Sequence, residues 1–385
     1  MTNIFINSPA KKSISEKQIP EENLETVTSI IGIGNPLIDI TAQFDKDSIQ
    51  KLGIETGRTI FADEKNKDFF NDLEKKPEVS YTPGGSVQNA LRVASWCLKM
   101  NNKNDHKNKL TMLGCVGNDN YKQKILNALN DCGVTPLLET LQGMETSRCG
   151  VAVYKKERCY LIPEIKASGH LSEKFIEEHK DEIYSHDALL IEGHFLKEKF
   201  DLCKNLCFEY YKENKLVILA LAAVFVVHHH QDKILEIANK SNMIIGNMEE
   251  AEFLAEDKGE NFHETFEKIH KKLAPYDRIL VVTAGHHGVF CSKYNYKTMQ
   301  FDFILQCFPP NYIKSEEITD LNGVGDAFLG GFLSQYLNGK SLYSCCKFGN
   351  YAASVVLHNV GCTFPKYYKI KTDDDEEDEE NNNKK

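Results

Sequence analysis

The sequence predicts an α/β protein with a large, mostly parallel sheet covered by helices on both faces, plus a small β-rich lid. Two observations carry this prediction. Short apolar strands alternate with amphipathic helices over most of the 385 residues, a pattern typical of parallel sheets that are buried on both sides. Two segments, 37–82 and 138–167, break the alternation with β-rich pieces. We expect them to form a second sheet over one edge of the first.

The elements follow in order along the chain. A polar arm over 1–28 precedes a buried strand over 29–41, which is interrupted at Asn35-Pro36. A charged helix over 63–76 leads to a glycine turn and an amphipathic helix, and a polar loop follows over 101–109. Further strands are expected at 110–116, 137–139, 149–155, 159–162, 188–192, 216–221, 243–246, 279–283, 288–292 and 301–307. Further helices are expected at 121–132, near 197–213, near 229–240, from 248, at 326–338 and at 341–358.

Composition and charge exclude some classes of protein. With 41% hydrophobic and 26% charged residues, the chain resembles an ordinary globular protein. Most of the net charge of −10 comes from eight consecutive acids at 373–380. We interpret 367–385 as a disordered, solvating tail, with a role in interactions as the alternative. The remainder, 29–366, suffices for one large domain, and nothing in it indicates a nucleic-acid-binding surface.

The apolar runs and the cysteines indicate the cell compartment in which the protein works. The longest apolar run, 216–227, has twelve residues, whereas a membrane-spanning helix needs roughly 20. Residues 1–28 lack the apolar core of a secretory leader. The twelve cysteines contain no zinc-type Cys-x2-Cys pair. We therefore expect reduced thiols in a cytoplasmic protein that does not cross a membrane.

The sharpest chemical pattern lies at Asp320-Leu321-Asn322-Gly323-Val324-Gly325-Asp326-Ala327-Phe328. Gly323 and Gly325 allow a tight turn, and the first amides of the following helix have no partners within it. Those amides and the helix dipole favour an anion such as a phosphate. Asp326 would repel a bound phosphate, but it suits a base that takes a proton from an attacking hydroxyl. The alternative is an ordinary helix start with an acidic first turn.

A second glycine turn, Gly84-Gly85-Ser86, opens the amphipathic helix that follows it. We expect both glycine turns to follow strands at the crevice past their carboxyl ends, where open α/β sheets bind ligands. The chain contains neither a Walker pattern, Gly-x4-Gly-Lys-Ser/Thr, nor the glycine spacing of a dinucleotide-binding turn.

Several stretches, in this order, resemble the ribokinase-like (PfkB) kinases over roughly residues 30–366. They are Gly32 to Ile40, Gly84 to Asn89, Ile245 to Ala251, Asp320 to Phe328 and Gly361-Cys362-Thr363-Phe364-Pro365. The Asn-Pro-Leu-x-Asp, Gly-Gly-Ser-x-Gln-Asn and Gly-Cys-Thr-Phe-Pro forms resemble the branch that acts on adenosine. The resemblance implies a ribokinase-like kinase domain over 29–366. It also implies transfer of the γ-phosphate of ATP to the 5′-hydroxyl of adenosine, giving AMP and ADP in purine salvage. We expect a monomer, although the sequence does not determine the oligomeric state.

The resemblance also implies roles for single residues. In the acceptor site, Asp39 would bind the ribose hydroxyls, assisted by the Gly85 amide and Asn89. The rest of that site would comprise Asn35, Leu37, Phe61 and Phe195 around adenine, with Gly84 and Ser86 in the glycine turn. Phe61 and Phe195 suit an ordinary core equally well.

The phosphate-transfer residues follow from the same resemblance. The amides of Gly323, Val324 and Gly325 would stabilise the phosphoryl group, Asp326 would be the base, and Arg158 would clamp the phosphate. Asn247 and Glu250 would organise Mg²⁺ through water. The ATP site would comprise Asn247, Glu250, Thr283, Gly285 and Asn350. Asn247 could instead only cap the helix from Met248.

The sequence departs from the family pattern at four places. One is the lid segment Tyr160-Leu161-Ile162-Pro163-Glu164-Ile165, where the family usually has Ala-Asn-Leu-Ala. Leu321 replaces a usual threonine, Val324 replaces a small residue, and Ala220-Leu221-Ala222-Ala223-Val224-Phe225 stands where the family has Asn-Leu-Ser-Ala-Pro-Phe. The glycines and Asp326 are retained, which favours activity. The departures keep two alternatives open: another ribokinase-like nucleoside or sugar kinase, or a catalytically weakened nucleoside-binding scaffold.

Overall fold

The computed structural model describes residues 27–45, 47–49, 69–101, 108–154, 158–222, 224–256, 261–273, 277–307, 313–314 and 317–365. A nine-stranded sheet forms its centre, in the order β13-β12-β11-β10-β9-β8-β1-β4-β5. These strands are β1 (Ser29–Ile33), β4 (Lys109–Gly117), β5 (Thr135–Leu141), β8 (Ala188–Glu192), β9 (Leu216–Ala220), β10 (Met243–Asn247), β11 (Arg278–Thr283), β12 (Val289–Asn295) and β13 (Gln300–Cys307). The pairings from β5 to β11 are parallel, whereas β12 is antiparallel to both of its neighbours. The predicted mostly parallel sheet is confirmed.

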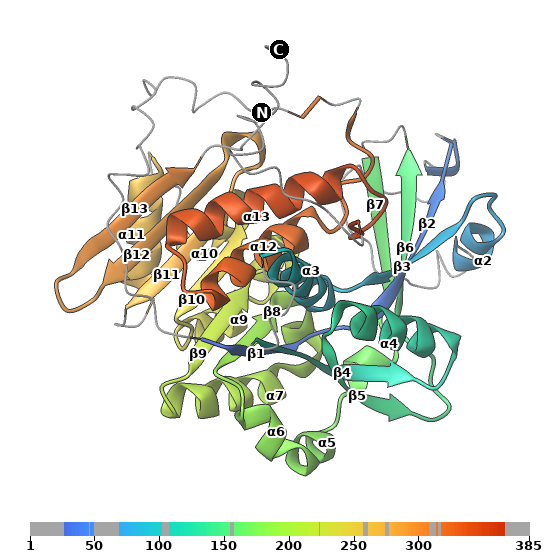
Figure 1. Cartoon of the computed structure of the whole chain (residues 1–385), viewed down its shortest axis with the longest axis horizontal. Helices are drawn as coiled ribbons and strands as arrows, with labels where there is room; N and C mark the ends of the chain where they lie inside the picture. The colour runs from blue at the N-terminus through green and yellow to red at the C-terminus, as the bar shows by residue number, and fades with distance from the viewer. Residues whose placement is uncertain are drawn as a thin grey trace, which may run out of the picture.

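Helices cover both faces of this sheet (Figure 1). One face carries α3 (Ser86–Asn101), α4 (Asn120–Cys132), α12 (Val324–Leu337) and α13 (Leu342–Leu357). The other carries α6 (Lys180–Tyr184), α7 (Gly193–Lys212), α8 (Val224–His229), α9 (Gln231–Ala238), α10 (Met248–Ala255) and α11 (Phe262–Lys272). Three further short helical elements are α5 (Glu173–Glu178), η2 (Ala167–His170) and η3 (Gly285–His287).

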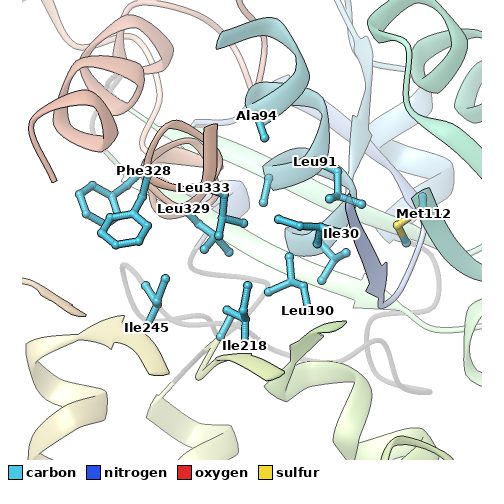
Figure 2. Close-up of a cluster of buried hydrophobic side chains, with 14 of the residues drawn as sticks. Ile30, Leu91, Ala94, Met112, Leu190, Ile218, Ile245, Phe328, Leu329 and Leu333 are labelled. Atoms are coloured by element: carbon cyan, nitrogen blue, oxygen red, sulfur yellow. The ribbon is translucent and has the colours of Figure 1, made fainter. Parts of the chain in front are cut away.

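Alternation along the strands produces two cores. Ile30 of β1 and Leu190 of β8 pack against α3 and α12, as Figure 2 shows for the first core. Their neighbours Ile31 and Leu189 belong to the second core on the opposite face. Successive strand residues point to opposite faces, so a strand in a doubly covered sheet is apolar at every position. This explains why these segments read as unbroken apolar runs.

The small sheet has the order β3-β2-β6-β7 and stands at the opposite end of the molecule from β12 and β13 (Figure 1). Its strands are β2 (Leu37–Gln43), β3 (Ser80–Gly84), β6 (Arg148–Tyr154) and β7 (Arg158–Glu164), and α2 (Phe69–Glu74) packs against it. The strand expected over 29–41 is thus two strands. The chain leaves the large sheet at Gly34 and enters the small one at Leu37, on either side of Asn35-Pro36.

Some predicted boundaries differ from the structure. Residues 138–141 were expected in the second sheet, but they belong to β5, which pairs in parallel with β4 at the edge of the large sheet. The sequence pattern could not reveal this, because a half-covered edge strand and a lid strand both alternate in polarity. Within the expected arm, Val27 is buried in the first core, and Thr28 bonds to Asp187. Residues 1–26, 50–68, 102–107 and 366–385 lie outside the described residues.

Four connections link the two sheets, and buried side chains fix the second pair. The β5–β6 and β7–η2 connections meet at Ser147, whose hydroxyl oxygen accepts hydrogen bonds from the amides of Lys166 at 2.8 Å and Ser168 at 3.2 Å. Because a buried oxygen of the first connection accepts two hydrogen bonds from the second, the two connections leave the small sheet together. Within the described residues, no helix is long and apolar enough to cross a bilayer.

Asp187 fixes the start of the two central strands β1 and β8. Its Oδ2 accepts hydrogen bonds from the amides of Thr28 and Ser29 and from both of their hydroxyls, at 2.9–3.0 Å. We predict that Asp187→Asn lowers the free energy of unfolding by about 1–3 kcal/mol, because it removes charge-assisted hydrogen bonds. Urea unfolding measures this. Asp181→Asn, an exposed acid on α6, is the matched control, and equal losses in both variants would contradict the prediction.

Candidate active site

A cavity opens where the small sheet faces the carboxyl end of β8 and the first turns of α3 and α12. Its volume is about 710 Å³, including the space at its open mouth. It is lined by Asn35, Leu37, Asp39, Gly85, Ser86, Asn89, Cys149, Pro163, Ile165, Glu192, His194, Glu198, Asn322 and Asp326. Elements far apart in the sequence therefore meet at one site.

The small sheet supplies one wall through its register. Asp39 of β2 pairs with Cys149 of β6, which in turn pairs with Pro163 of β7. These three residues thus form a row across neighbouring strands, which lie about 4.8 Å apart. Leu37, two residues before Asp39, projects from the same face. The wall carries one carboxylate at its end and apolar groups beside it.

Asp39 is the buried carboxylate of this wall, with only 4% of its surface exposed. Its Oδ2 accepts a hydrogen bond from the Asn322 side-chain amide at 3.0 Å. A Cβ at Gly84 would lie 2.4 Å from Asp39 Oδ1, so only glycine fits beside it. Burial raises the pKa of Asp39 to about 7, and the hydrogen bond from Asn322 partly opposes this rise. The carboxylate is therefore fixed in place, yet poorly solvated.

The turn before α12 has the form of an anion site. Gly323 has φ +78° and precedes the helix, and within the described residues no side chain caps α12. A Cβ at Gly323 would lie 2.5 Å from Cys362 Cβ. Asp320, 1% exposed, holds the turn by accepting the amide hydrogens of Asn322 at 2.9 Å and Gly361 at 2.8 Å. The first-turn amides of α12 remain available for an anion.

Asp326 lies in that first turn, at the cavity wall. Its Oδ2 accepts a hydrogen bond from the Asn89 side chain at 3.0 Å. Asn89 is oriented in turn by the buried Arg92, whose guanidinium donates to Asn89 Oδ1 at 3.3 Å. Burial raises the pKa of Asp326, and hydrogen bonds from Asn89 and Ser86 oppose the rise. A carboxylate with a raised pKa beside an anion site is suited to accept a proton.

A close approach of α3 and α12 brings Asn89 and Asp326 together. A Cβ at Gly330 of α12 would lie 2.5 Å from the backbone oxygen of Ala90 in α3. The two helices therefore pack with their backbones in contact, and they lie next to each other in Figure 1. A hydrogen bond between Asn89 and Asp326 joins them near their N-terminal ends. Gly85 has φ +97°, and a Cβ there would lie 2.1 Å from the Asn35 oxygen. Both glycine turns thus converge on the cavity.

The expected relation of these turns to the strands is only partly correct. The turn at Gly84-Gly85 follows β3, but β3 belongs to the small sheet rather than the large one. The turn at Gly323 follows residues 317–322, none of which is in a strand. Helix packing, not a strand end, brings the second turn to the site.

A second group of predicted residues lies at the carboxyl ends of β10 and β11, outside the cavity lining. Asn247 pairs with Thr283 across the two strands, and Gly285 follows two residues later with φ +53°. Asn350 lies on α13. This location, past the ends of two parallel strands, suits a nucleotide.

Asn247 and Glu250 form a complete capping box on α10. The Glu250 amide donates to Asn247 Oδ1 at 2.9 Å, and the Glu250 carboxylate accepts from the Asn247 backbone and side-chain N–H groups at 2.9 and 2.8 Å. Glu250 is 2% exposed, and burial raises its pKa to about 7. The described residues contain no cluster of three or more metal-ligating side chains. The pair fits Mg²⁺ only through water, because both side chains are already hydrogen-bonded.

Seven predicted acceptor-site or catalytic residues line the cavity: Asn35, Leu37, Asp39, Gly85, Ser86, Asn89 and Asp326. Phe195 was expected beside adenine, but it is fully buried in the second core and does not line the cavity. Its neighbour His194 lines the cavity instead, because adjacent residues of a helix point about 100° apart. Phe61 lies outside the described residues. Arg158 begins β7 opposite Tyr154, five residues before the cavity residue Pro163.

Sequence reasoning missed several lining residues. His194 and Glu198 are one turn apart on α7 and face the cavity together, and burial lowers the pKa of His194 to about 4. Glu192 is 1% exposed, and burial raises its pKa to about 7. A signal for Glu192 existed, since it ends an apolar strand just before a glycine. The others carry no local pattern.

Comparisons with known proteins agree with this architecture. The profile of the pfkB family carbohydrate kinases matches residues 47–367. Adenosine kinase 1 of Arabidopsis thaliana is 27% identical over 345 residues, which cover 88% of this chain and 96% of that protein. Adenosine kinase of Dictyostelium discoideum is 28% identical over 339 residues, covering 87% and 96%.

Solved structures give the same result. The crystal structure of Anopheles gambiae adenosine kinase in complex with P1,P4-di(adenosine-5) tetraphosphate matches with a TM-score of 0.77 at 27% identity, covering 89% of this chain and 100% of that one. The Trypanosoma brucei brucei adenosine kinase (apo) matches with a TM-score of 0.75 at 25% identity, covering 87% and 100%. The fold is therefore ribokinase-like, and the chain belongs to the pfkB family of carbohydrate kinases.

Proposed function

We propose that this protein is an adenosine kinase, which transfers the γ-phosphate of ATP to the 5′-hydroxyl of adenosine to give AMP and ADP. The observation that carries the proposal is Asp326, which lies at the start of α12 beside uncapped amides and lines the same cavity as the buried Asp39. Similar proteins from two organisms that are named adenosine kinases support the choice of acceptor. The reaction would recover adenosine in purine salvage.

The cavity has the groups that a nucleoside needs. Asp39 would accept hydrogen bonds from the two ribose hydroxyls, and the amide of Gly85 and Asn89 would assist. Asn35 Oδ1 is buried and has no hydrogen-bond partner among the described residues, so it would accept one from the ligand. The adenine ring would lie against the apolar side chains beside Asp39, which include Leu37 and Cys149.

The proposed transfer follows from the geometry around α12. The 5′-hydroxyl oxygen attacks the γ-phosphorus, the bond from that phosphorus to the β–γ bridging oxygen breaks, and ADP leaves with the bond electrons. The hydroxyl proton passes to Asp326. The turn amides at Gly323, Val324 and Gly325 hold the transferring phosphoryl group by hydrogen bonds aligned with the helix dipole. Arg158 of β7 would neutralise part of its charge.

ATP would bind at the ends of β10 and β11, next to Thr283, Gly285 and Asn350. Mg²⁺ would neutralise phosphate charge and orient the phosphates, and Asn247 and Glu250 would hold it through water. Both side chains are locked in the capping box, which fixes the position of the Glu250 carboxylate before any nucleotide arrives.

We further propose one kinase domain over 29–366, with the small sheet as its lid, between an arm over 1–28 and a tail over 367–385. The monomer and the cytoplasmic location remain part of this proposal. Ten of the twelve cysteines, those whose side chains the structure describes, are free thiols, which supports a reducing compartment.

A phosphorylation screen tests the proposed function. Purified protein is incubated with ATP and Mg²⁺ against adenosine, other nucleosides and sugars, and the products are separated. Adenosine is expected to be the best acceptor. Turnover of another acceptor only would favour a different kinase of the family, and binding without turnover would favour a scaffold. The scaffold alternative has some support from the altered segment after β9, where Ala220 and Ala222 replace the polar Asn and Ser of the family pattern.

The first prediction concerns the ribose. If Asp39 accepts both ribose hydroxyls, 2′-deoxyadenosine leaves part of a buried carboxylate unpaired, which costs roughly 1–3 kcal/mol. It should be phosphorylated at least about tenfold less efficiently than adenosine. Adenosine binding should also strengthen as pH rises from 6 to 8, because the pKa of Asp39 in the free protein is about 7. Steady-state kinetics measure both effects, and equal efficiency for the two nucleosides would remove Asp39 from the site.

The second prediction concerns the lid. A small sheet joined to the large one by four connections should close over the nucleoside and exclude water from the transfer. Hydrogen exchange should therefore slow in β2, β3, β6 and β7 on addition of adenosine, and less on addition of ATP alone. Exchange that is the same with and without adenosine argues against closure.

The third prediction concerns the base. Asp326→Asn keeps the shape and an oxygen that can accept from Asn89, but it cannot take the proton. General-base catalysis contributes on the order of 10²–10⁴-fold, so turnover should fall by that order. Calorimetry should show adenosine binding preserved. Near wild-type turnover in this variant would mean that the proton goes elsewhere.

A further inference from the structure

Glu192 is a buried carboxylate that the transfer reaction does not use. It ends β8, the strand between β1 and β9 near the centre of the large sheet, and it is 1% exposed. It lines the cavity wall. A carboxylate this deeply buried loses hydration, so a fixed set of donors must face it.

Two backbone amides from different turns face Glu192, one on each oxygen. Asn35 N–H donates to Oε1 at 2.9 Å, and Val87 N–H donates to Oε2 at 3.0 Å. A Cβ at Gly34 would lie 2.8 Å from the Glu192 Cδ. The chain before Asn35 can therefore approach the carboxylate only because Gly34 has no side chain.

These two turns are connections between the sheets. Residues 34–36 join β1 to β2. Gly85 and the following helix α3, which contains Val87, lead from β3 back to β4. The first leads directly into Leu37 and Asp39, and the second contains Ser86 and Asn89. Both connections thus carry cavity-lining residues, and Glu192 is the group that they share.

We propose that Glu192 is a positioning residue for the phosphate acceptor. Its two oxygens hold both connections in the position that directs Asp39 and Asn89 into the cavity. The proposal rests on the proposed function, because the acceptor is taken to be adenosine. Glu192 acts through the backbone and takes no part in the bond changes.

The chemistry of the donors requires an ionised carboxylate. Both neighbours are N–H groups, so each oxygen must accept, and the Val87 amide belongs to the first turn of α3, where the helix dipole favours negative charge. Burial raises the pKa of Glu192 to about 7, and the hydrogen bonds from Asn35 and Val87 oppose the rise. Experiments at pH 8 therefore examine the ionised form. A glutamine would turn an NH₂ group toward one of the two amides.

Glu192→Gln is the test, and Asp187→Asn is its matched control. Asp187 precedes the same strand at its opposite end and also accepts backbone amides, from Thr28 and Ser29, but it does not line the cavity. At pH 8, Glu192→Gln should raise KM for adenosine about tenfold, the worth of one hydrogen bond to a charged group. KM for ATP should stay within about twofold of the wild-type value. Asp187→Asn should lower the thermal midpoint and leave both KM values unchanged.

Hydrogen exchange supplies a readout that needs no turnover. In Glu192→Gln, peptides that contain Asn35 and Val87 should exchange faster than in the wild type, and in Asp187→Asn they should not. Equal exchange in the two variants, or an adenosine KM no higher in Glu192→Gln than in Asp187→Asn, overturns the proposal. Absence of adenosine turnover in the wild type would instead refute the proposed function, and the exchange comparison would still decide the role of Glu192.

Glu192→Asp covers the case in which the glutamine variant does not fold. The aspartate side chain is one methylene shorter, so its carboxylate reaches at most one of the two amides. KM for adenosine should therefore rise, whereas KM for ATP should not. An unchanged adenosine KM in this variant would overturn the proposal.

Discussion

The site depends on two helices that start side by side. The backbones of α3 and α12 touch where Gly330 faces the Ala90 oxygen, because a Cβ at Gly330 would lie only 2.5 Å from it. Their first turns therefore share one cavity, and the Asn89 side chain lies 3.0 Å from Asp326. Both helix N-termini also direct their partial positive charge into that cavity. In the proposed mechanism, this concentrated charge would hold the phosphate and the ionised Asp326 together.

The site contains carboxylates that are costly to keep ionised. Asp39 and Glu192 in the cavity, and Glu250 at the ends of β10 and β11, each have a pKa raised to about 7 by burial. Their ordinary values are 3.8 for Asp and 4.5 for Glu, so the folded protein holds more protons than the unfolded chain between those values and 7. These groups therefore contribute most to the free energy of unfolding below their ordinary pKa values. Their contribution is lost as the pH rises toward 7. Sites that bind or react often carry such a cost.

The two pairs of connections between the sheets are fixed by different chemistry. Ser147, a neutral hydroxyl, accepts the amides of Lys166 and Ser168 in the pair next to β6 and β7. Glu192 accepts the amides of Asn35 and Val87 in the pair that leads to Asp39 and Asn89. Charge-assisted hydrogen bonds are roughly twice as strong as neutral ones. The stronger attachment thus belongs to the connections that lead to the cavity-lining residues Asp39 and Asn89.

The sequence by itself determined the alternation of strands and helices, both glycine turns, and most cavity residues that lie within them, because periodicity and turn chemistry are local. Its motif also pointed to Asp326, which the structure places in the cavity wall. Only the tertiary structure decided that β5 joins the large sheet, that His194 rather than Phe195 faces the cavity, and that Glu192 holds two distant turns. Each of these depends on strand pairing, helix rotation or contacts between residues more than 100 positions apart. A local pattern carries no information about such contacts, because the same periodicity would arise whichever distant segments packed together.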